Sequence, residues 1–423
     1  MPRRFLIKMK IAFIMGFFPA LSTTFINNQI TGLLDAGHEI EVFALRRPDE
    51  KKIHPDIIHY KLLDRVTYFE IPRGRIRRAF NAVHLLIKNF QRGPSQLLKS
   101  LNIFKYGREA LTLNLFYYLI PFLGKNFDIL HAHSGPLGMI GWRLRELGVS
   151  GKLITTFYGA DLSSFVNANG VAFYLPIFAD SDRLLPICQY FRKKLLNWGC
   201  QENKIIVHPV GIDLEIFIFS QQQRKPDHIF RILTVARLIE KKGIAYALHA
   251  VAILACQYEQ IEYTVAGYGP LNDSLQLLAQ NLQISNRVKF VGAVDRDEQL
   301  RLFAQSDLFL LPSVTAADGE EEGTPTVLLE AQAAGLPVIS TWHSGIPEIV
   351  QEKKTGFLVA EKDVQGLVEK IAYLIANPEI ARGLGAAGRN FMENNFDIKK
   401  LNRRLEKIYK DLLPGETSPS EIN

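Results

Sequence analysis

Short runs of β-branched and apolar residues alternate with helical patterns along almost the whole chain. This alternation is typical of parallel sheets with crossover helices, so we expect an α/β fold. Strands are predicted near 10–15, 39–45, 66–71, 127–132, 152–157, 182–187 and 204–208, and then near 231–236, 261–266, 287–291, 307–312, 337–341 and 356–359. Because the pattern runs twice, the sequence predicts two doubly wound, Rossmann-like domains.

The break between the two runs sets the predicted domain boundaries. We expect a first domain over 1–212, a linker over 213–229, a second domain over 230–397, a helix over about 398–412 and a polar tail over 414–423. A chain of 423 residues is also too long for a single hydrophobic core. Ligands of open sheets bind beyond the carboxyl ends of the strands, so we expect function in a cleft between the domains, on the strand-to-helix loops.

Composition narrows the class of protein. The formal net charge of +7 favours an acidic partner, which could be nucleic acid, an anionic membrane or a phosphorylated small molecule. Three widely spaced cysteines predict neither a disulfide framework nor a zinc site, and favour a reducing cytosol. The opening residues imitate a signal peptide, but their apolar core is short, so we expect a buried first strand, with 1–8 as an extension that the fold does not need. The chain has no G-x-x-x-x-G-K-[ST], G-x-S-x-G or H-E-x-x-H motif and no apolar run long enough to span a bilayer.

The stretch EEEGTPTVLLEAQAAG at 320–335 predicts an anion site. Thr324 suits the N-cap, Pro325 the first helical position and Gly335 the C-terminal turn, so a helix is expected over 325–334. The amides expected to be free are those of Thr326, Val327 and Leu328. Free amides and the positive end of the helix dipole suit a phosphate or diphosphate.

Two carboxylates flank this predicted phosphate site. Glu322 precedes the helix and Glu330 lies within it. They would repel a phosphate unless they bind hydroxyls, so we expect a sugar at Glu322 and a ribose diol at Glu330. The alternative is a solvated acidic loop and a surface glutamate.

Two further loops of the second half suit a nucleotide. Arg237 and Lys242 follow the strand predicted at 231–236 and suit a diphosphate, although cations are common in ordinary loops. Gly267 and Gly269 begin a G-x-G pattern whose third glycine is replaced by Asn272, so we expect no nicotinamide cofactor. The two glycines would instead let the backbone approach a nucleotide closely.

In the first half, His131 and His133 lie two apart at the end of a predicted strand. No third metal ligand has a suitable spacing, so we expect one structural and one cleft-facing histidine; a buried histidine with satisfied hydrogen bonds is the alternative. Asp161 offers a carboxylate to a substrate hydroxyl or forms an Asx turn. Asp180 and Asp182 flank the entrance of a strand, where we expect no metal role.

Taken together, these loops resemble those of glycosyltransferase family 4, retaining enzymes of the GT-B fold that move a sugar from a nucleotide donor to an acceptor. The E-x7-E pair, the two cations, the G-x-G-P loop and the cleft histidine occur in the family's order, and the resemblance covers almost the whole chain. The segments 18–30 and 315–350 resemble enzymes that build bacterial exopolysaccharides of the colanic-acid type. Two departures are the Thr23 that replaces a usual glutamate near the acceptor and the Tyr158 that replaces a usual histidine.

The resemblance implies a hexosyltransferase that acts by front-face retaining transfer, without a metal or other cofactor. The implied catalytic residues are His133, Glu322, Arg237 and Lys242. The implied donor-binding residues are Gly16, Gly267, Gly269, Arg287, Val288, Gly323, Thr324, Thr326, Val327, Leu328 and Glu330. Acceptor binding is expected at Thr23 and Asp161. The base is expected against Gly269 and the strand at 287–289, and helix 398–412 is expected to brace the first domain.

The stretch 73–108 contains nine basic and no acidic residues. Its apolar residues recur at helical spacing, which is typical of a basic amphipathic helix at a membrane surface. The alternative is a helix whose apolar stripe packs on its own sheet. Nucleic acid is not expected as a partner, because no recognition fold accompanies the charge.

The sequence therefore predicts a cytoplasmic enzyme, peripheral at the inner membrane face. Its donor is expected to be a UDP- or GDP-sugar, and its acceptor a saccharide or a polyprenyl-diphosphate-linked saccharide. The competing hypotheses are a GT-B sugar-nucleotide epimerase and a catalytically dead sugar-nucleotide-binding protein. The presence of all the implied catalytic residues argues against a dead site.

Overall fold

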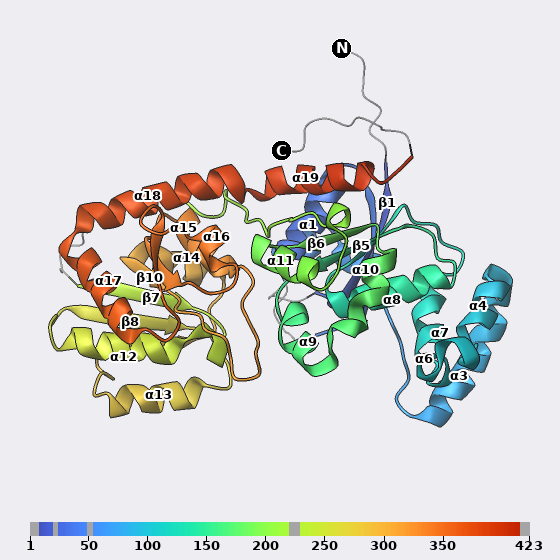
Figure 1. Cartoon of the computed structure of the whole chain (residues 1–423), viewed down its shortest axis with the longest axis horizontal. Coiled ribbons are helices and arrows are strands. Elements are labelled where there is room, and N and C mark those ends of the chain that lie inside the picture. Colours follow the sequence, from blue (N-terminus) through green and yellow to red (C-terminus); the bar gives the residue numbers. More distant parts are fainter. Residues whose placement is uncertain (1–7, 20–23, 49–53, 220–228, 415–423) are drawn as a thin grey trace, which may run out of the picture.

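The protein has two lobes that lie side by side (Figure 1). The structure is a computed structural model that describes residues 8–19, 24–48, 54–219 and 229–414. Within these ranges each lobe is built on one six-stranded sheet in which all the paired strands are parallel. The predicted arrangement of two doubly wound α/β domains is confirmed.

The first sheet has the order β3-β2-β1-β4-β5-β6. Its strands are β1 Lys10–Phe17, β2 Glu39–Arg46, β3 Val66–Tyr68, β4 Ile129–Ala132, β5 Lys152–Phe157 and β6 Arg183–Pro186. The order reverses between β1 and β4, so the ligand-binding crevice of this sheet is expected beyond their carboxyl ends.

The second sheet has the order β12-β11-β10-β7-β8-β9 and reverses between β7 and β10. Its strands are β7 Phe230–Val235, β8 Ile261–Ala266, β9 Val288–Gly292, β10 Leu308–Leu310, β11 Val338–Thr341 and β12 Gly356–Val359. Counted within its own domain, this order matches that of the first sheet.

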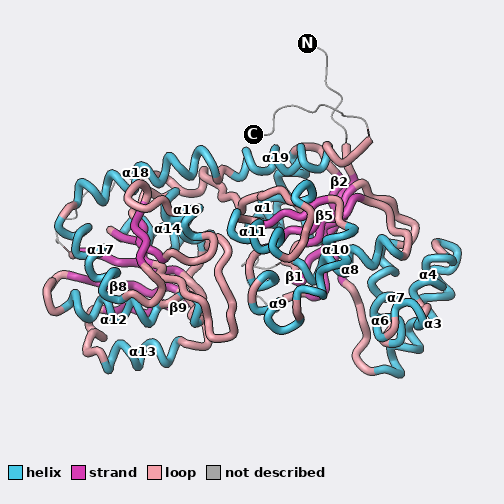
Figure 2. The backbone as a smooth tube through the Cα atoms, in the orientation of Figure 1, coloured by secondary structure: helices cyan, strands magenta, loops and turns pink. Residues whose placement is uncertain are grey.

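Helices connect successive strands in both domains (Figure 2). The helices before the second sheet are α1 Thr24–Asp35, α2 Pro55–His59, α3 Arg75–Asn89, α4 Pro94–Ser100, α5 Ile103–Tyr106, α6 Arg108–Leu111, α7 Asn114–Leu119, α8 Gly135–Glu146, α9 Ser164–Asn169, α10 Leu175–Asp180 and α11 Gln189–Asn197. Those that follow β7 are α12 Ile244–Ala255, α13 Asn272–Asn281, α14 Arg296–Gln305, α15 Thr326–Ala333, α16 Ile346–Ile349, α17 Val364–Ala376, α18 Pro378–Asn395 and α19 Ile398–Lys410.

The central strands are buried on both faces, which explains their near-continuous apolar sequence. In β1, residues 11–15 are buried. Side-chain caps fix several helix starts: Asp295 accepts from the amide of Glu298, and Asp363 accepts from the amide of Gly366. These local signals agree with the periodicity that predicted the elements.

The strand predicted at 204–208 is wrong. The segment lies beside β6, with the amides of Ile206 and His208 donating to the carbonyls of Leu184 and Pro186. However, it makes only one isolated bridge, between Leu184 and Ile205. Pro209 follows and has no N–H with which to extend the pairing.

The last helix returns to the first domain (Figure 1). α18 lies along the second domain, and α19 continues beside α1, where the Asn402 amide donates to the Asn28 carbonyl at 2.9 Å. Leu405 and Tyr409 of α19 are buried in the core that includes β1 and β2. The first domain therefore completes its core with residues that follow the second domain in sequence.

A group of short helices, α3 to α7, lies between β3 and β4 at one end of the molecule (Figure 1). Ala82, Leu97 and Tyr106 pack inward, into the core shared with β1 and β4. The outer side chains of α3 do not pack against the rest of the protein. Ile76 and Phe80, for example, are 76% and 75% exposed. The expected alternative, an apolar stripe packed on its own sheet, is therefore wrong for this face.

Among the described residues, no single helix has the length and apolar composition needed to cross a bilayer. One sharply bent helix pair, Ala160–Asn169 with Val171–Asp180, meets that test jointly.

Candidate active site

Loops at the carboxyl ends of the two sheets contact each other. A Cβ atom added to Gly323, which follows β10, would lie 2.3 Å from the carbonyl oxygen of Tyr158, which follows β5. Glu348, beyond β11, accepts hydrogen bonds from the amides of Gln189 and Tyr190 at the start of α11. The two crevices therefore meet between the domains, where the sequence places the site.

His133 lies just beyond β4, at the point where the first sheet reverses. Its ring stacks on Phe13, with 4.7 Å between the centroids, and its Nδ1 shares a 2.7 Å hydrogen bond with the Tyr158 hydroxyl. Nε2 is buried and has no partner among the described residues. Burial lowers the pKa of His133 to about 3, so the ring is neutral and Nε2 is available to a ligand.

His131 has a structural role, as expected for one of the two histidines. Its Nδ1 lies 2.6 Å from the Tyr409 hydroxyl and its Nε2 lies 2.7 Å from the Thr156 hydroxyl. Both ring nitrogens are thus used in linking β4 to β5 and to α19. This leaves His133 as the cleft-facing histidine of the pair.

Glu322 and Lys242 form a buried ion pair at the opposite side of the cleft. The Lys242 Nζ lies 2.8 Å from Glu322 Oε1, and the Nζ of neighbouring Lys241 lies 3.4 Å from the same oxygen. Lys241 also pairs with Glu320 at 2.7 Å. The two sequence-predicted residues are therefore in contact, within a network of alternating charge.

The network fixes the ionisation of its members. Burial alone would raise the pKa of Glu322, but Lys242 and Lys241 outweigh it and lower that pKa to about 2. Burial lowers the pKa of Lys242, and Glu322 opposes that shift. Glu322 is therefore a carboxylate near neutral pH, able to accept hydrogen bonds from sugar hydroxyls.

The predicted glycines lie where side chains would collide with the backbone. Gly267 has a φ of +145°, and a Cβ there would lie 1.7 Å from the Ala236 carbonyl oxygen. A Cβ on Gly269 would lie 2.4 Å from the Leu238 carbonyl oxygen. The two loops after β7 and β8 are thus packed together, which brings exposed Arg237 to the same edge of the sheet as Lys242.

The helix at the predicted anion site begins one residue later than expected. α15 spans Thr326–Ala333 with Pro325 at the N-cap, so Thr324 is not the cap, and its buried hydroxyl has no partner among the described residues. The Leu328 amide donates to the Pro325 carbonyl at 3.0 Å, so the expectation that it is free is wrong. Within the described ranges, the amides of Thr326 and Val327 have no acceptor.

Glu330 lies one turn inside α15 and is mostly buried. Gln299 donates to its Oε2 at 2.6 Å, and Arg296 lies 3.2 Å from its Oε1. Thr326 and Glu330 line a narrow crevice together with Thr24 of α1. Glu330 is therefore not a surface residue, and it faces the first domain.

Arg287 and Val288 do not lie at the cleft. They stand at the amino end of β9, where Arg287 donates to the Glu259 carbonyl and Val288 packs in the core. Parallel strands present their carboxyl ends at one edge, so the other end of β9, at Gly292, faces the site. Gly292 accepts a 2.7 Å hydrogen bond from the Gly267 amide, so this end of β9, and not Arg287, adjoins the loop of Gly267.

Asp161 has a structural role rather than the predicted contact with the acceptor. Its carboxylate is buried and accepts from the amides of Gly135, Tyr158 and Gly159. These bonds join the loops after β4 and β5, so the Asx-turn alternative describes it better. The other predicted acceptor residue, Thr23, lies outside the described residues.

Three residues near the site were not assigned a role from the sequence. Lys241 joins the ion-pair network, and Tyr158 holds His133. His343 follows β11; its Nε2 accepts from the Glu322 amide at 2.9 Å, and its Nδ1 lies 2.6 Å from Glu361. The position of His343 at the carboxyl end of a predicted strand was the signal that could have identified it.

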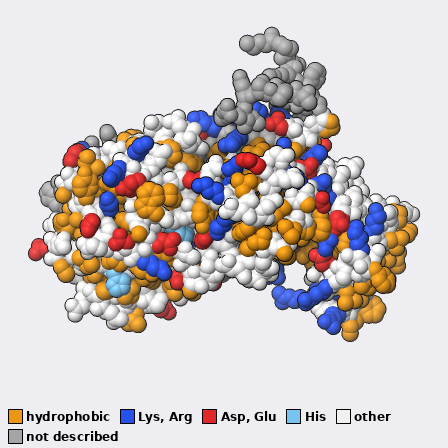
Figure 3. Space-filling model, in the orientation of Figure 1, with side chains coloured by type: hydrophobic (Ala, Val, Ile, Leu, Met, Phe, Trp, Pro, Cys, Tyr) orange, Lys and Arg blue, Asp and Glu red, His pale blue; other side chains and the backbone are white. Residues whose placement is uncertain are grey.

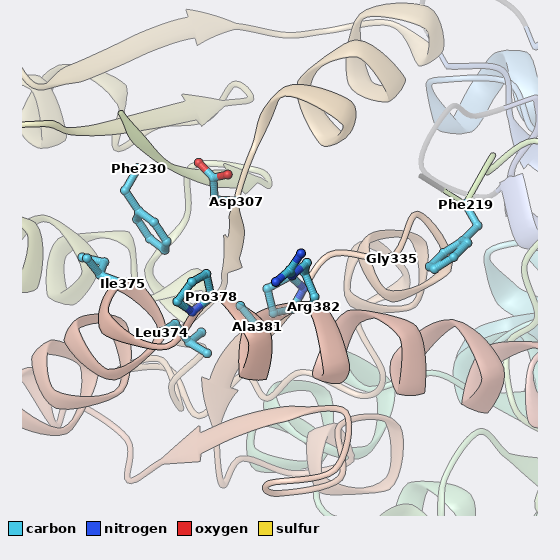
Figure 4. A pocket seen from close by; sticks show the side chains of 10 residues that line it. Phe219, Phe230, Asp307, Gly335, Leu374, Ile375, Pro378, Ala381 and Arg382 are labelled. Atoms are coloured by element: carbon cyan, nitrogen blue, oxygen red, sulfur yellow. The ribbon is translucent and has the colours of Figure 1, made fainter. Parts of the chain in front are cut away.

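Gly16, at the carboxyl end of β1, lines a cavity of about 1500 Å³ in the first domain together with His133 and Ser134. A different cavity, of about 300 Å³, lies in the second domain (Figure 4). Phe230 and Asp307 line this second cavity and stand at the amino ends of β7 and β10. It therefore opens at the edge of the sheet opposite to the active site.

Two family descriptions together match most of the chain. Residues 22–216 match "Glycosyltransferase Family 4", and residues 215–391 match "Glycosyl transferases group 1". The first match covers the domain that contains His133, and the second covers the domain that contains Glu322 and Lys242. The division between the matches coincides with the passage from one sheet to the other.

Relatives and solved structures agree with this division. The chain is 35% identical over 413 residues to the Escherichia coli strain K12 protein assigned to colanic acid biosynthesis as the glycosyltransferase WcaL, covering 96% of this chain and 100% of that protein. It is 34% identical over 411 residues to the amylovoran biosynthesis glycosyltransferase AmsK of Erwinia amylovora, with the same coverage of both chains.

Solved structures share the fold at lower identity. Sucrose-phosphate synthase from Thermosynechococcus elongatus superposes with a TM-score of 0.72 at 19% identity, over 96% of this chain and 99% of that chain. Anabaena Alr3699/HepE in complex with UDP and glucose superposes with a TM-score of 0.69 at 16% identity, over 95% and 99%. The chain is a glycosyltransferase that belongs to glycosyltransferase family 4 and has the GT-B fold.

Proposed function

We propose that this glycosyltransferase moves a hexose from a UDP- or GDP-sugar to a lipid-linked or growing saccharide in exopolysaccharide assembly, with retention of configuration at the anomeric carbon. The observation that carries the proposal is the Lys242–Glu322 ion pair, set beside Arg237 and shortly before the amino end of α15. Relatives named for colanic acid and amylovoran biosynthesis support the assignment to exopolysaccharides.

The donor diphosphate would lie between the two cations and the amino end of α15. The amides of Thr326 and Val327 have no acceptor within the described ranges, and Arg237 is exposed beside Lys242. When the bond between the anomeric carbon and the diphosphate breaks, negative charge grows on the phosphate oxygens. Preorganised donors and cations stabilise that charge.

The transfer needs no enzyme nucleophile in this arrangement. The acceptor hydroxyl oxygen would bond to the anomeric carbon on the face from which the diphosphate leaves, and its proton would pass to the departing phosphate oxygen. Glu322 would accept hydrogen bonds from hydroxyls of the donor sugar. His133 would contact the same sugar through Nε2, which has no partner among the described residues.

The nucleoside would lie along the carboxyl ends of β7 to β9. Gly267 and Gly269 allow close approach of the backbone there, and Gly292 lies at the end of the neighbouring strand. Glu330 would bind the ribose hydroxyls after exchanging its contacts with Arg296 or Gln299.

A first experiment compares transferase with epimerase activity. A panel of UDP- and GDP-hexoses is incubated with the protein, with and without a lipid extract from polysaccharide-producing cells. We expect one donor to be consumed only with the extract, and NMR to show that the new linkage has the anomeric configuration of the donor. Interconversion of the sugar in the absence of the extract would favour the epimerase, and an inverted linkage would contradict the retaining mechanism.

We also propose that the reaction is independent of divalent metal ions, because Arg237 and Lys242 supply positive charge at the diphosphate. Excess EDTA should leave the rate of transfer unchanged. Loss of activity in EDTA with recovery on adding Mg²⁺ or Mn²⁺ would contradict this.

A lipid-linked acceptor requires the enzyme to work at a membrane, and α3 offers a docking face. Ile76, Phe80, Val83 and Ile87 recur on one side of the helix, and all four are exposed. Basic side chains surround them, with no acidic residue between 73 and 108. Figure 3 shows hydrophobic and basic side chains gathered at this end of the molecule. This combination suits the inner, anionic face of a bilayer.

Flotation with liposomes tests this docking face. The wild type should float with vesicles that contain phosphatidylglycerol at low salt, and a Phe80→Glu/Ile87→Glu variant should stay in the soluble fraction. Leu277→Glu is the matched control, because Leu277 is an exposed apolar residue on α13 of the other domain. Failure of the wild type to float would exclude the membrane contact.

A further inference from the structure

The cavity beside His133 has a lining that the donor site does not explain. It has a volume of about 1500 Å³ and lies in the first domain, between the carboxyl end of β1 and the loop that leads into α3. Its described lining residues all belong to the first domain. Glu322, Lys241 and Lys242 are not among them.

Four arginines line this cavity, and no carboxylate does so among the described residues. Arg46 and Arg47 come from the end of β2, Arg73 from the loop before α3, and Arg78 from α3 itself. Arg46, Arg47 and Arg73 are exposed to solvent, and no carboxylate lies beside them among the described residues that line the cavity. The cavity therefore has a strongly positive potential.

Arg78 is held in place by neutral groups. Its Nε donates to the Pro72 carbonyl at 3.1 Å, and its Nη1 donates to the Thr112 carbonyl at 2.9 Å and to Asn114 Oδ1 at 3.2 Å. These acceptors orient the guanidinium without cancelling its charge. Arg78 thus adds a fixed positive charge to the cavity wall, while the other three side chains can reach a ligand.

The rest of the lining suits a saccharide. Phe17, Tyr68 and Tyr118 present aromatic rings, and Phe17 is 51% exposed. Aromatic faces pack well against the apolar faces of sugar rings. The unpartnered Nε2 of buried His133 lies at the same cavity, next to the place proposed for the reacting sugar.

We propose that this arginine-lined cavity is the acceptor subsite and that it binds a saccharide bearing a diphosphate, with the diphosphate held by Arg46, Arg47 and Arg73. This inference rests on the proposed function and deepens it, because it assigns the side chains that hold the diphosphate of a lipid-linked acceptor. The planar guanidinium fork matches phosphate oxygens, and several such bonds add specificity. Arg73 and Arg78 also join the cavity to α3, so a diphosphate in the cavity lies beside the face proposed to meet the membrane.

Calorimetry with three probes tests the subsite. Farnesyl diphosphate, inorganic diphosphate and farnesol are titrated into the full chain in the presence of saturating UDP, which occupies the donor site. Farnesyl diphosphate should bind, and farnesol should not. Arg47→Gln and Arg73→Gln should each weaken the binding of farnesyl diphosphate by about tenfold or more. Arg301→Gln, an exposed arginine on α14 of the second domain, should bind as the wild type does.

The outcomes distinguish inorganic diphosphate from a prenyl diphosphate as the ligand. They also distinguish failure of the acceptor subsite from failure of the proposed donor. Equal, arginine-dependent binding of inorganic and farnesyl diphosphate would support the diphosphate subsite without a prenyl contribution. Binding of farnesol as tight as that of farnesyl diphosphate, or arginine variants that bind as the wild type does, would overturn the inference. If UDP fails to bind, the titration is repeated with saturating GDP, the other proposed nucleotide. If neither nucleotide binds, the proposed donor fails; the titration is then repeated without nucleotide on Lys242→Ala, in which one cation of the second-domain site is removed, and the same criteria apply to the cavity.

Discussion

The first and second domains share one strand order but differ in how the loops at their carboxyl edges hold charge. In the second domain the cations Lys241 and Lys242 are already paired with Glu320 and Glu322 at 2.7 and 2.8 Å. In the first domain the arginines that line the cavity have no carboxylate beside them among the described lining residues, and the cleft-facing His133 is neutral. One topology thus carries a site with internally balanced charge and a site with unbalanced positive charge.

The difference indicates which half needs a bound ligand to balance its charge. Paired, buried charges hold a fixed geometry before the ligand arrives, as a site that stabilises developing charge requires. Unpaired, exposed arginines adjust to a ligand and attract an anion over a distance. We therefore associate the second domain with the chemistry on the donor and the first with capture of the acceptor.

The largest expected effect comes from breaking the balanced pair. Lys242→Ala should lower the rate of transfer by about 10² to 10³-fold, because it removes a cation from the developing phosphate charge. Glu322→Gln should lower it comparably, because the amide accepts hydrogen bonds from sugar hydroxyls poorly. The measurement is initial-rate kinetics on variants shown by circular dichroism to be folded; wild-type turnover in either variant would contradict the site.

Glycine substitutions compare the rigidity of the two sites. Gly267→Ala should lower the free energy of unfolding by about 3 kcal/mol, because its φ of +145° and the nearby Ala236 carbonyl exclude a side chain. Gly16→Ala should change it by less than about 0.5 kcal/mol, because nothing lies within 4 Å of the added Cβ. Urea unfolding measures both, and equal losses would contradict this difference between the two cleft edges.

The neutral histidines of the first domain predict acid sensitivity. Burial lowers the pKa values of His133 and His208 to about 3, whereas in the unfolded chain they are near 6.5. Between these pH values the unfolded chain binds more protons than the folded chain. The contribution of these histidines to the free energy of unfolding is therefore fully present above pH 6.5 and is lost as the pH falls toward 3. The slope approaches about 1.4 kcal/mol per pH unit for each histidine.

Denaturation curves between pH 8 and pH 4.5 measure this slope. His208→Gln should reduce this slope by the contribution of one histidine, about 1.4 kcal/mol per pH unit. A stability that does not depend on pH across this range would show that the buried histidines are not held neutral. Glu322 adds to the slope only toward the acid end of this range, because its carboxyl group is charged in both the folded and the unfolded chain well above its unfolded pKa of 4.5.

The smallest expected effect is at the contact between the domains. Lys194 of α11 and Glu321 of the second domain lie 2.6 Å apart and are partly buried. Lys194→Gln should lower the free energy of unfolding by about 1 kcal/mol, more than Glu298→Gln, which breaks the exposed Arg301–Glu298 pair within α14. Equal effects would show that the interdomain pair is no stronger than an ordinary surface pair.

The sequence predicted the fold well because its strands are short, apolar and regularly separated. It predicted Glu322, Lys242 and His133 as site residues through motif spacing, and these lie at the cleft edge of their sheets. It placed Arg287 at the cleft, although Arg287 lies at the amino end of β9, because the pattern located the strand but not the end of it that faces the cleft. It also made Thr324 the helix cap, because the choice between Thr324 and Pro325 depends on backbone angles that local composition does not determine.

Tertiary contacts explain the remaining differences. No local pattern shows that the Asp161 carboxylate would accept hydrogen bonds from three amides. Nor does one show that Lys241 would be buried beside Lys242. The periodicity of α3 located its apolar stripe but could not show whether that stripe would be covered. The structure leaves Phe80 and Ile87 exposed, and this observation supports the proposed membrane contact.

The central claim is that the second domain binds the donor and the first domain binds the acceptor. It is tested most directly by calorimetric titration of UDP and GDP into the wild type, Lys242→Ala and Arg73→Gln. We predict that the nucleotide that binds the wild type binds Lys242→Ala about tenfold or more weakly and binds Arg73→Gln with unchanged affinity. Unchanged binding to Lys242→Ala together with weakened binding to Arg73→Gln would place the donor in the first domain and contradict the account.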